Sequence, residues 1–315
     1  MLTPDALKQF ETDGYLVVEN LLDVAQIAAI KQEYQELMDQ LYQDWYAQGL
    51  VAAAPEGLSF WDKLEQCYKG DFEWYQPFDI SLPHHGIQDD TPMHFGPAVF
   101  SMATNPRILD VVEQLIGPEI TSNPIQHVRI KPPARALPSS EARAHVTTTD
   151  WHQDMGVTLE EADQTQMVTV WLAITDAQIE HGCLQVAPGN RSDLLPHCTR
   201  SQVGIAEPFV PQDTARPVPV RAGGAVIFNP YTPHASLPNT SERFRWSFDL
   251  RYNVTGQPSG RSQFPHFVAR SAKAPDSVLR DWKKWRSMWE DTRHHLAHVA
   301  PIAQHRWASD APYCA

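Results

Sequence analysis

The stretch GGAVIFNPYTPHASLPNTSERFRWSFDLRY, residues 223–252, contains two β-type segments separated by a turn-rich loop. Residues 225–228 form a short apolar run after two glycines, which predicts a buried strand. Residues 245–252 alternate strictly between charged or hydroxylated and aromatic or aliphatic side chains. Because successive side chains of a strand point to opposite faces, this segment predicts a strand with one polar and one apolar face.

Similar short β-rich runs precede this stretch, with Pro, Gly and Asn turns between them, at residues 125–131, 167–174, 183–187 and 217–220. A block of short strands predicts an antiparallel sandwich or barrel. Helical patterns flank the block, at residues 3–13, 23–46 and 106–116 before it and at 276–299 after it. We therefore expect one domain over residues 1–315, with a helical N-terminal region at residues 1–119, a β core at about 120–255 and a helical C-terminal extension at residues 256–315.

The N-terminal region carries its own boundary signals. Asn105 and Pro106 are typical of the first residues of a helix, and Gly117 is typical of its end. Residues 15–18 have the composition of a strand. Residues 50–100 are irregular and aromatic, and two interpretations stay open for their rings: a lid or pocket wall, or ordinary core packing. The rings concerned are Trp61, Trp74, Tyr75 and Phe78.

His152 and Asp154 lie two residues apart, so that in a strand both side chains point to the same face. His234 follows the apolar strand 225–228 and can reach the rim of the same sheet after a tight turn. Two imidazoles and one carboxylate on one face leave coordination positions open, which is the ligand set of non-haem Fe(II) oxygenases. The alternative is a hydrogen-bonded His–Asp pair at a strand end.

Other histidines occur on the last predicted helix, where His294 and His298 share a face. Such a pair can bind zinc adventitiously, but we interpret this face as a solvated helix surface.

Arg245 and Ser247 lie two apart on the polar face of the strand 245–252. A guanidinium and a hydroxyl in this arrangement can hold a carboxylate, because arginine donates two parallel N–H bonds and serine adds a third. Arg243 is a second candidate, closer to the turn. The alternative is that Arg245 and Arg251 pair with acidic side chains across strands.

Five ordered segments resemble the phytanoyl-CoA dioxygenase family of Fe(II)/2-oxoglutarate oxygenases, over roughly residues 3–253. They are Lys131-Pro-Pro, Trp151-His-Gln-Asp154, VTVWLAITDAQIEHGCLQVAPGN190, GGAVIFNPYTPH234 and Arg245, preceded by the N-terminal LTPDALKQFETDGYLVVENLLDVAQIAAIK. The family commonly has Asn-Gly where this chain has His181-Gly182. That departure lies in a turn away from the expected ligands.

The resemblance implies a mainly β fold, a double-stranded β-helix (jelly roll, cupin-like) core flanked by N- and C-terminal α-helices. It implies Fe(II), 2-oxoglutarate and O2 as cofactors, with His152, Asp154 and His234 as the metal ligands. Arg245, helped by Ser247, would bind the distal carboxylate of 2-oxoglutarate. The family's other positions for co-substrate or substrate correspond to Thr169, Lys131 and Arg129.

The same resemblance implies hydroxylation of an unactivated C–H bond of a small metabolite or natural-product intermediate, with release of succinate and CO2. Asp154 favours hydroxylation over halogenation, because related halogenating enzymes carry a small residue at this position. The stretch 132–150 is expected to form a flexible loop over the site. Two rival hypotheses are a cupin-like metal enzyme that does not use 2-oxoglutarate and a catalytically silent jelly-roll binding protein.

The charge of the chain argues against nucleic acids and acidic membranes as partners, because 38 acidic residues face 25 basic ones and the net charge is −13. The N-terminus has neither a basic start nor an apolar run typical of a signal peptide. The four cysteines fit no zinc module, and we expect all four to be reduced thiols in a cytoplasmic protein.

Overall fold

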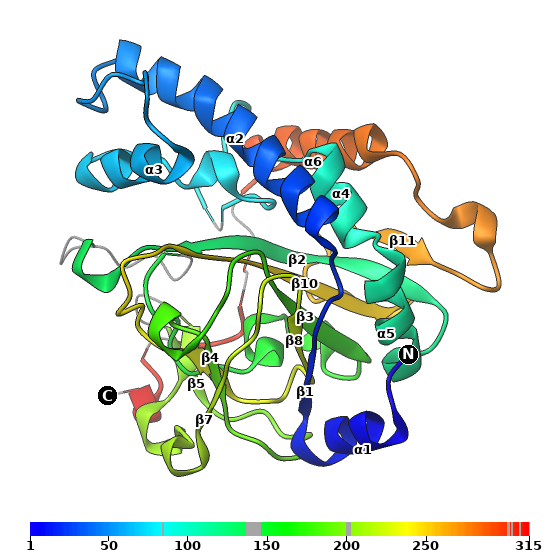
Figure 1. The fold of residues 1–315 in the computed structure, drawn as a ribbon. Helices are drawn as coiled ribbons and strands as arrows, with labels where there is room; N and C mark the ends of the chain where they lie inside the picture. Colours follow the sequence, from blue (N-terminus) through cyan, green and yellow to red (C-terminus); the bar gives the residue numbers. More distant parts are fainter. Residues whose placement is uncertain are drawn as a thin grey trace.

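The computed structural model of the chain describes residues 1–83, 85–136, 146–199, 203–300, 303, 305–308 and 310–314. The largest element is a six-stranded antiparallel sheet with the strand order β1-β8-β3-β10-β2-β11 (Figure 1). Its strands are β1 (Tyr15–Val18), β8 (Ala225–Phe228), β3 (Met167–Ala173), β10 (Arg245–Val254), β2 (Ile120–Lys131) and β11 (Phe267–Arg270).

A smaller sheet has the strand order β7-β4-β9, formed by β7 (Arg216–Val218), β4 (Leu184–Val186) and β9 (His234–Ser236). Strands β5 (His197–Thr199) and β6 (Val203–Ile205) form a separate pair. Buried side chains of β3 and β8 pack against those of β4 and β7, so that the two main sheets face each other. The mainly β sandwich predicted from the sequence is therefore confirmed.

Helices cover the other face of the six-stranded sheet, where α2, α3, α4 and α6 lie above it in Figure 1. The helices are α1 (Pro4–Asp13), α2 (Val24–Ala47), α3 (Phe60–Lys69), α4 (Pro97–Ala103), α5 (Pro106–Ile116) and α6 (Trp282–Ala297). Tyr34 of α2 packs edge-on against Trp246 of β10, with ring centroids 5.0 Å apart. None of the described helices is both long enough and apolar enough to cross a membrane.

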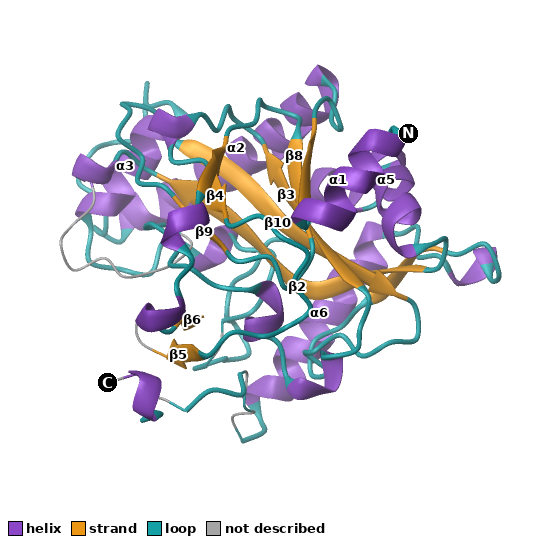
Figure 2. Ribbon diagram, turned by 90° about the horizontal axis from the view of Figure 1, so that it is seen from below, coloured by secondary structure: helices purple, strands orange, loops and turns teal. Residues whose placement is uncertain are grey.

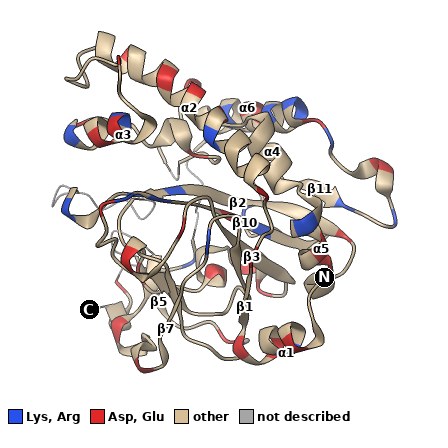
Figure 3. Ribbon diagram, viewed as in Figure 1, with Lys and Arg blue, Asp and Glu red and all other residues tan. Residues whose placement is uncertain are grey.

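The polar and apolar side chains that alternate along β10 point to opposite faces of the large sheet. Its apolar side chains lie in the core under the helices: Trp246, Phe248, Leu250 and Tyr252. Its polar side chains point toward the smaller sheet and are also buried: Arg245, Ser247, Asp249 and Arg251. Figure 3 shows basic residues, in blue, along the ribbon of the large sheet. The polar face of the strand is therefore an interior surface.

The helix boundary signals were read correctly for α5. The side chain of Asn105 accepts a hydrogen bond from the Arg107 N–H (2.8 Å), and Gly117 ends the helix with a φ of 88°. The sequence prediction missed α3, which begins with a reciprocal pair of hydrogen bonds between Ser59 and Asp62. The last helix begins at Trp282 instead of residue 276, because Asp281 caps it and Pro275–Ser277 forms a separate turn.

The aromatic rings of residues 50–100 belong mainly to the core on the helical side. Trp74, Tyr75 and Phe78 are buried there, and Trp61 packs partly exposed against the ring of Phe244. Of the two interpretations left open, core packing is the one the structure supports. The β structure also extends beyond residues 120–255, because the edge strands β1 and β11 come from the two flanks.

The expectation of four reduced cysteines is wrong for two of them. Cys198 and Cys314 form a disulfide across 116 residues of sequence, with Cα atoms 5.6 Å apart, whereas Cys67 and Cys183 are buried free thiols. The pairing follows from the C-terminal segment folding back onto β5, as Figure 2 shows. The spacing of the cysteines carries no information about such a tertiary contact.

The C-terminal segment packs on the loop that carries Asp154. The indole N–H of Trp307 donates to the carbonyl of Gly156 (2.6 Å), and its ring stacks on His197 with centroids 5.0 Å apart. Arg306 forms an ion pair with Asp163 (2.6 Å). A Cβ on Gly156 would lie 2.5 Å from the His197 ring, so only glycine allows this close packing. The tail therefore supports the 154–163 segment from outside.

Candidate metal centre

His152, Asp154 and His234 meet between the two sheets, and all three are buried. The backbones of His152 and His234 form an antiparallel bridge, with each N–H donating to the other's carbonyl at 2.9 Å. This bridge adds the His152 segment to the edge of the smaller sheet beside β9. Asp154 begins a 3-10 turn (Asp154–Val157) directly after the extended Gln153. The predicted convergence of these three residues is thus observed, although Asp154 lies just past the extended segment.

The ligating atoms of the three side chains lie within 4.8 Å of one another. The Nε2 atoms of His152 and His234 are 3.7 and 3.9 Å from Oδ1 of Asp154. Each imidazole has its Nδ1 within hydrogen-bond distance of a backbone carbonyl two residues earlier, that of Asp150 (2.8 Å) or Thr232 (3.0 Å). These contacts fix both rings and direct both Nε2 atoms toward the carboxylate, the arrangement typical of metal-binding histidines.

The protonation states of the three groups suit a metal ion. Burial, and secondarily the neighbouring His234, lowers the pKa of His152 to about 3, so its imidazole is neutral near pH 7. Burial also lowers the pKa of His234. Burial alone would raise the pKa of Asp154, but the charge of Arg251 and the two imidazoles outweigh it and lower that pKa. Two neutral imidazoles and a carboxylate are the forms that ligate iron.

Asp154 is held from two strands. Arg251 of β10 donates to its Oδ1, and the Thr169 hydroxyl of β3 donates to its Oδ2. Arg251 also donates to the carbonyl of Ile125 (2.9 Å). The carboxylate is therefore oriented by an ion pair and a hydroxyl. Thr169, expected at the co-substrate, here contacts the acidic member of the triad.

Arg245 lines the same cavity as the triad and is only 1% exposed. Its guanidinium donates to the Ser247 hydroxyl (2.8 Å) and lies 5.0 Å from the centre of the Trp171 ring. Among the described residues no carboxylate pairs with it, and its Nε atom has no hydrogen-bond partner. Burial and the nearby Arg129 lower its pKa to about 10, which still leaves it charged at pH 7. A buried cation without an acid is costly, and such a site favours an anion.

The other predicted basic residues differ in their partners. Arg129 forms an ion pair with Asp249, and both line the cavity. Lys131 donates to the Ser236 hydroxyl (2.6 Å) and the Leu237 carbonyl (2.8 Å), with no acid among its described partners. Burial, with the charges of Arg245 and Arg129, holds the pKa of Lys131 well below its usual value. Lys131 is therefore a second buried basic group that lacks an acidic partner.

The sequence left open whether the arginines of this region bind a ligand carboxylate or pair with acidic side chains, and the answer differs from one arginine to the next. Arg251 does pair with an acid, Asp154, whereas Arg245 does not. Arg243 is exposed at the turn, away from the cavity. Residues 137–145 of the expected loop 132–150 lie outside the described residues. Sequence reasoning missed the contacts of Asp154 with Arg251 and of Arg129 with Asp249, although the alternation of β10 places Asp249 and Arg251 on the face of Arg245.

Comparison with known proteins agrees with this geometry. The chain is 24% identical over 267 residues to a probable phytanoyl-CoA dioxygenase of Caenorhabditis elegans, covering 80% of this chain and 75% of the relative. The fold is similar to that of the non-haem monooxygenase ThoJ, at 20% identity and a TM-score of 0.58 over 93% of this chain and 98% of ThoJ. It is also similar to SnoK, an α-ketoglutarate-dependent carbocyclase of nogalamycin biosynthesis, at 18% identity and a TM-score of 0.50 over 89% and 94% of the two chains.

The sequence profile of the phytanoyl-CoA dioxygenase family matches residues 10–247, which include the whole triad and Arg245. The match therefore covers most of the helical N-terminal region and most strands of the two main sheets, and it ends within β10. This chain belongs to the phytanoyl-CoA dioxygenase family.

Proposed function

We propose that the protein is an Fe(II)- and 2-oxoglutarate-dependent oxygenase that hydroxylates an unactivated C–H bond of a small metabolite or natural-product intermediate. Such a reaction consumes O2 and releases succinate and CO2. The observation that carries the proposal is the presence, in one cavity, of a buried metal-ligating triad and a buried arginine without an acidic partner. An iron ion would occupy the triad, and one carboxylate of a dicarboxylate would neutralise the arginine.

His152, Asp154 and His234 would hold the iron through their Nε2 and carboxylate oxygen atoms. The bound iron supplies open coordination positions for the 2-oxo acid group and for O2, and with them the oxidising chemistry. The chain keeps the three ligands oriented through the Asp150 and Thr232 carbonyls and through the contacts of Asp154.

Arg245 and Ser247 would bind the distal carboxylate of 2-oxoglutarate. The guanidinium lies over the Trp171 ring, and the Ser247 hydroxyl already lies beside it. Lys131 donates to the hydroxyl of Ser236, which lines the same cavity, and Thr169 orients Asp154. Arg129, neutralised by Asp249, is the group we assign to the substrate side of the cavity.

Hydroxylation is our choice among the reactions that such sites perform. Related halogenating enzymes carry a small residue at the position of Asp154. The carboxylate of Asp154 therefore argues against halogenation. Ring closure, as in the carbocyclase with a similar fold, uses the same kind of iron site. Mass spectrometry of the product separates the two, because hydroxylation adds one oxygen atom and ring closure removes two hydrogen atoms.

The test is succinate formation from 2-oxoglutarate with Fe(II), ascorbate and candidate substrates, in the wild type and in Arg245→Ala. We expect Arg245→Ala to lose most of the turnover because its 2-oxoglutarate affinity falls. Arg243→Ala, an exposed arginine two residues earlier, is the matched control and should keep the activity. Succinate formation insensitive to Arg245→Ala would contradict the role assigned to Arg245, and no succinate from the wild type with any candidate substrate would favour a metal enzyme that does not use 2-oxoglutarate.

An anaerobic titration with Fe(II) and 2-oxoglutarate addresses the other rival. The chelate absorbs weakly in the visible range, so a band should appear in the wild type and vanish in His234→Ala. No band at saturating ligand would favour a binding protein without catalytic activity.

A further inference from the structure

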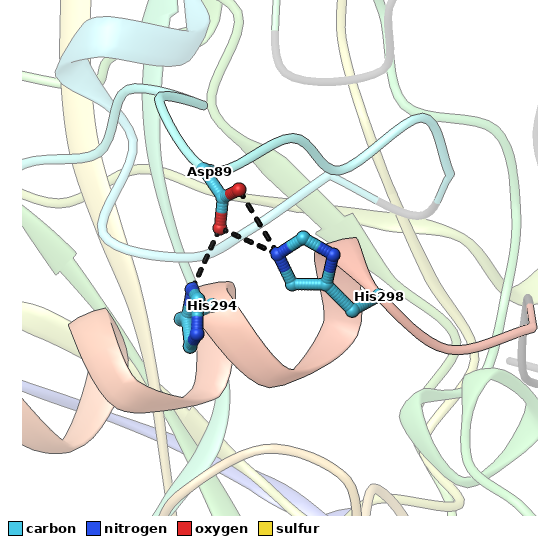
Figure 4. A group of neighbouring side chains, drawn as sticks. All are labelled: Asp89, His294 and His298. Atoms are coloured by element: carbon cyan, nitrogen blue, oxygen red, sulfur yellow. Dashed lines mark hydrogen bonds and ion pairs between the residues drawn. The ribbon is translucent and has the colours of Figure 1, made fainter.

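A second group of metal-ligating side chains lies at the surface, on the opposite side of the sheet from the triad. Figure 4 shows Asp89 beside His294 and His298 of the last helix, with all three exposed. Helix α6 lies on the helix-covered face of the six-stranded sheet (Figure 1), whereas the triad lies between the two sheets. This group is therefore separate from the proposed iron site.

The three side chains meet as a metal site requires. Nδ1 of His294 lies 2.8 Å from Oδ1 of Asp89, and Nε2 of His298 lies 3.0 Å from its Oδ2. His294 lies in the last turn of α6 and His298 directly follows the helix, and their ring centroids are 5.0 Å apart. Zinc bonds of about 2.0–2.2 Å place neighbouring ligand atoms roughly 3.3 Å apart, so small side-chain rotations would admit an ion.

Hydrogen bonds that do not involve the Asp89 carboxylate hold the backbone of the turn that carries it. The Gln88 N–H donates to the Thr91 hydroxyl (2.7 Å), which closes the turn around Asp89. Arg293, the residue before His294, donates to the Thr91 carbonyl (3.1 Å) and so holds this turn against α6. A carboxylate fixed in this way loses little conformational freedom when it binds a metal ion.

Helix α6 is equally well anchored. Trp285 and Trp289 are buried, and their rings pack against Phe95 with centroids 4.6 and 5.0 Å away. Phe95 follows the Gln88–Thr91 turn by only four residues. The helix and the turn are thus joined through one apolar contact, and the ligands lie where the two elements meet at the surface.

We propose that Asp89, His294 and His298 form a second metal site, for a divalent transition-metal ion such as Zn²⁺, that ties α6 to the turn at residues 88–91. Two imidazole nitrogens select such ions over Mg²⁺ and Ca²⁺, which prefer oxygen ligands. Three protein ligands with one open side leave at least one position for water or an outside ligand.

The simpler interpretation is a surface ion pair, in which Asp89 accepts hydrogen bonds from two imidazoles and binds no metal. Exposed ion pairs contribute little to stability, because water and salt screen the charges. The two interpretations differ in an observable, because only the metal site binds an additional zinc ion.

Equilibrium dialysis of the full-length, metal-stripped protein against Zn²⁺ distinguishes them. The buried triad also has zinc-binding groups, so the comparison is between the wild type and His294→Ala/His298→Ala, which leaves the triad intact. We expect the double variant to bind one zinc ion per chain less than the wild type. His295→Ala and Asp90→Ala, exposed neighbours outside the group, should bind as much zinc as the wild type.

A melting experiment gives a second readout. Without metal, the double variant should unfold at the temperature of the wild type, because its replaced side chains are exposed. Added Zn²⁺ should raise the melting temperature of the wild type more than that of the double variant. Equal zinc stoichiometry and equal thermal shifts in both proteins would overturn the proposal and leave Asp89 as an ion-pair acceptor only.

Discussion

Arg251 and Asp154 form a buried ion pair inside the β sandwich, although 97 residues separate them in the sequence. The pair joins β10, an inner strand of the large sheet, to the loop that carries the acidic member of the triad. It explains how a carboxylate can stay ionised at a position that is only 1% exposed.

Replacement of Arg251 by methionine removes this counter-charge while keeping an apolar side chain of similar length. We expect a loss of about 3–5 kcal/mol in the free energy of unfolding, because the Asp154 carboxylate stays buried without a counter-charge. Iron affinity should fall as well. Urea denaturation and anaerobic Fe(II) titration measure the two effects. Arg243→Met, at an exposed arginine, should change neither, and equal behaviour of the two variants would contradict the assigned role.

Thr169→Val tests the role of the hydroxyl at the triad. Valine has almost the same shape, so the change removes one hydrogen bond to a buried carboxylate and should cost about 1–3 kcal/mol in stability. Partners of metal ligands typically change metal affinity by about 10–100-fold. If Thr169 positions Asp154, Fe(II) affinity falls while the KM for 2-oxoglutarate stays close to that of the wild type. A raised KM with unchanged iron affinity would show instead that it binds the co-substrate.

The stability of the protein should fall as the pH drops below about 6.5. His197 is buried, with Nδ1 at the Leu195 carbonyl (2.7 Å) and Nε2 accepting from the Gln153 N–H (3.0 Å). Burial lowers its pKa to about 4, compared with 6.5 for an exposed histidine. Between these two values the unfolded chain binds a proton that the folded protein does not. The contribution of His197 is thus fully present above pH 6.5 and is lost toward pH 4.

The difference in pKa corresponds to about 3 kcal/mol over this range. Urea unfolding at pH 7 and pH 5, in the wild type and in His197→Gln, measures it. Glutamine offers an oxygen to the Gln153 N–H but does not titrate. The variant should therefore lose less free energy of unfolding between pH 7 and pH 5 than the wild type. The same pH slope in both proteins would contradict this assignment.

Reduction of the Cys198–Cys314 disulfide should destabilise the protein by roughly 2–5 kcal/mol, because the bond closes a long loop. Cys198→Ser/Cys314→Ser should unfold at the same temperature with and without a reducing agent, whereas the wild type should shift downward when reduced. Peptide-level hydrogen exchange should then show faster exchange in residues 305–308 and 154–163. Unchanged exchange in the 154–163 segment would mean that the tail does not support it.

Much of the site followed from short-range patterns. The spacing of His152 and Asp154, and the alternation from Arg245 to Tyr252, express the two-residue period of a strand, which local sequence shows directly. The partner of each charged residue depends on strand register instead. Arg129 and Asp249 meet only because β2 and β10 pair antiparallel, with Ser247 opposite Arg129. Such a register is set by the whole sheet and cannot be obtained from one segment.

The errors in the sequence predictions have two origins. The Ser59–Asp62 pair that begins α3 was a local signal that was overlooked. The predicted strand at residues 15–18 is present as β1, but that β1 and β11 form the edges of the large sheet depends on tertiary pairing. The Cys198–Cys314 bond likewise depends on how the chain folds back. Local periods thus identified the strands and the ligands, and long-range contacts determined the sheet edges, the ion pairs and the disulfide.

The contacts of Trp307 and Cys314 bear on how the protein is made. During synthesis the N-terminal segments of a chain leave the ribosome first and begin to fold. Trp307, which braces the Asp154 loop, lies 151 residues after the Gly156 carbonyl that it contacts and is therefore translated later. The loop of each new molecule thus lacks this outer support until residue 307 has been made, so the finished geometry of the proposed metal site is completed late in synthesis.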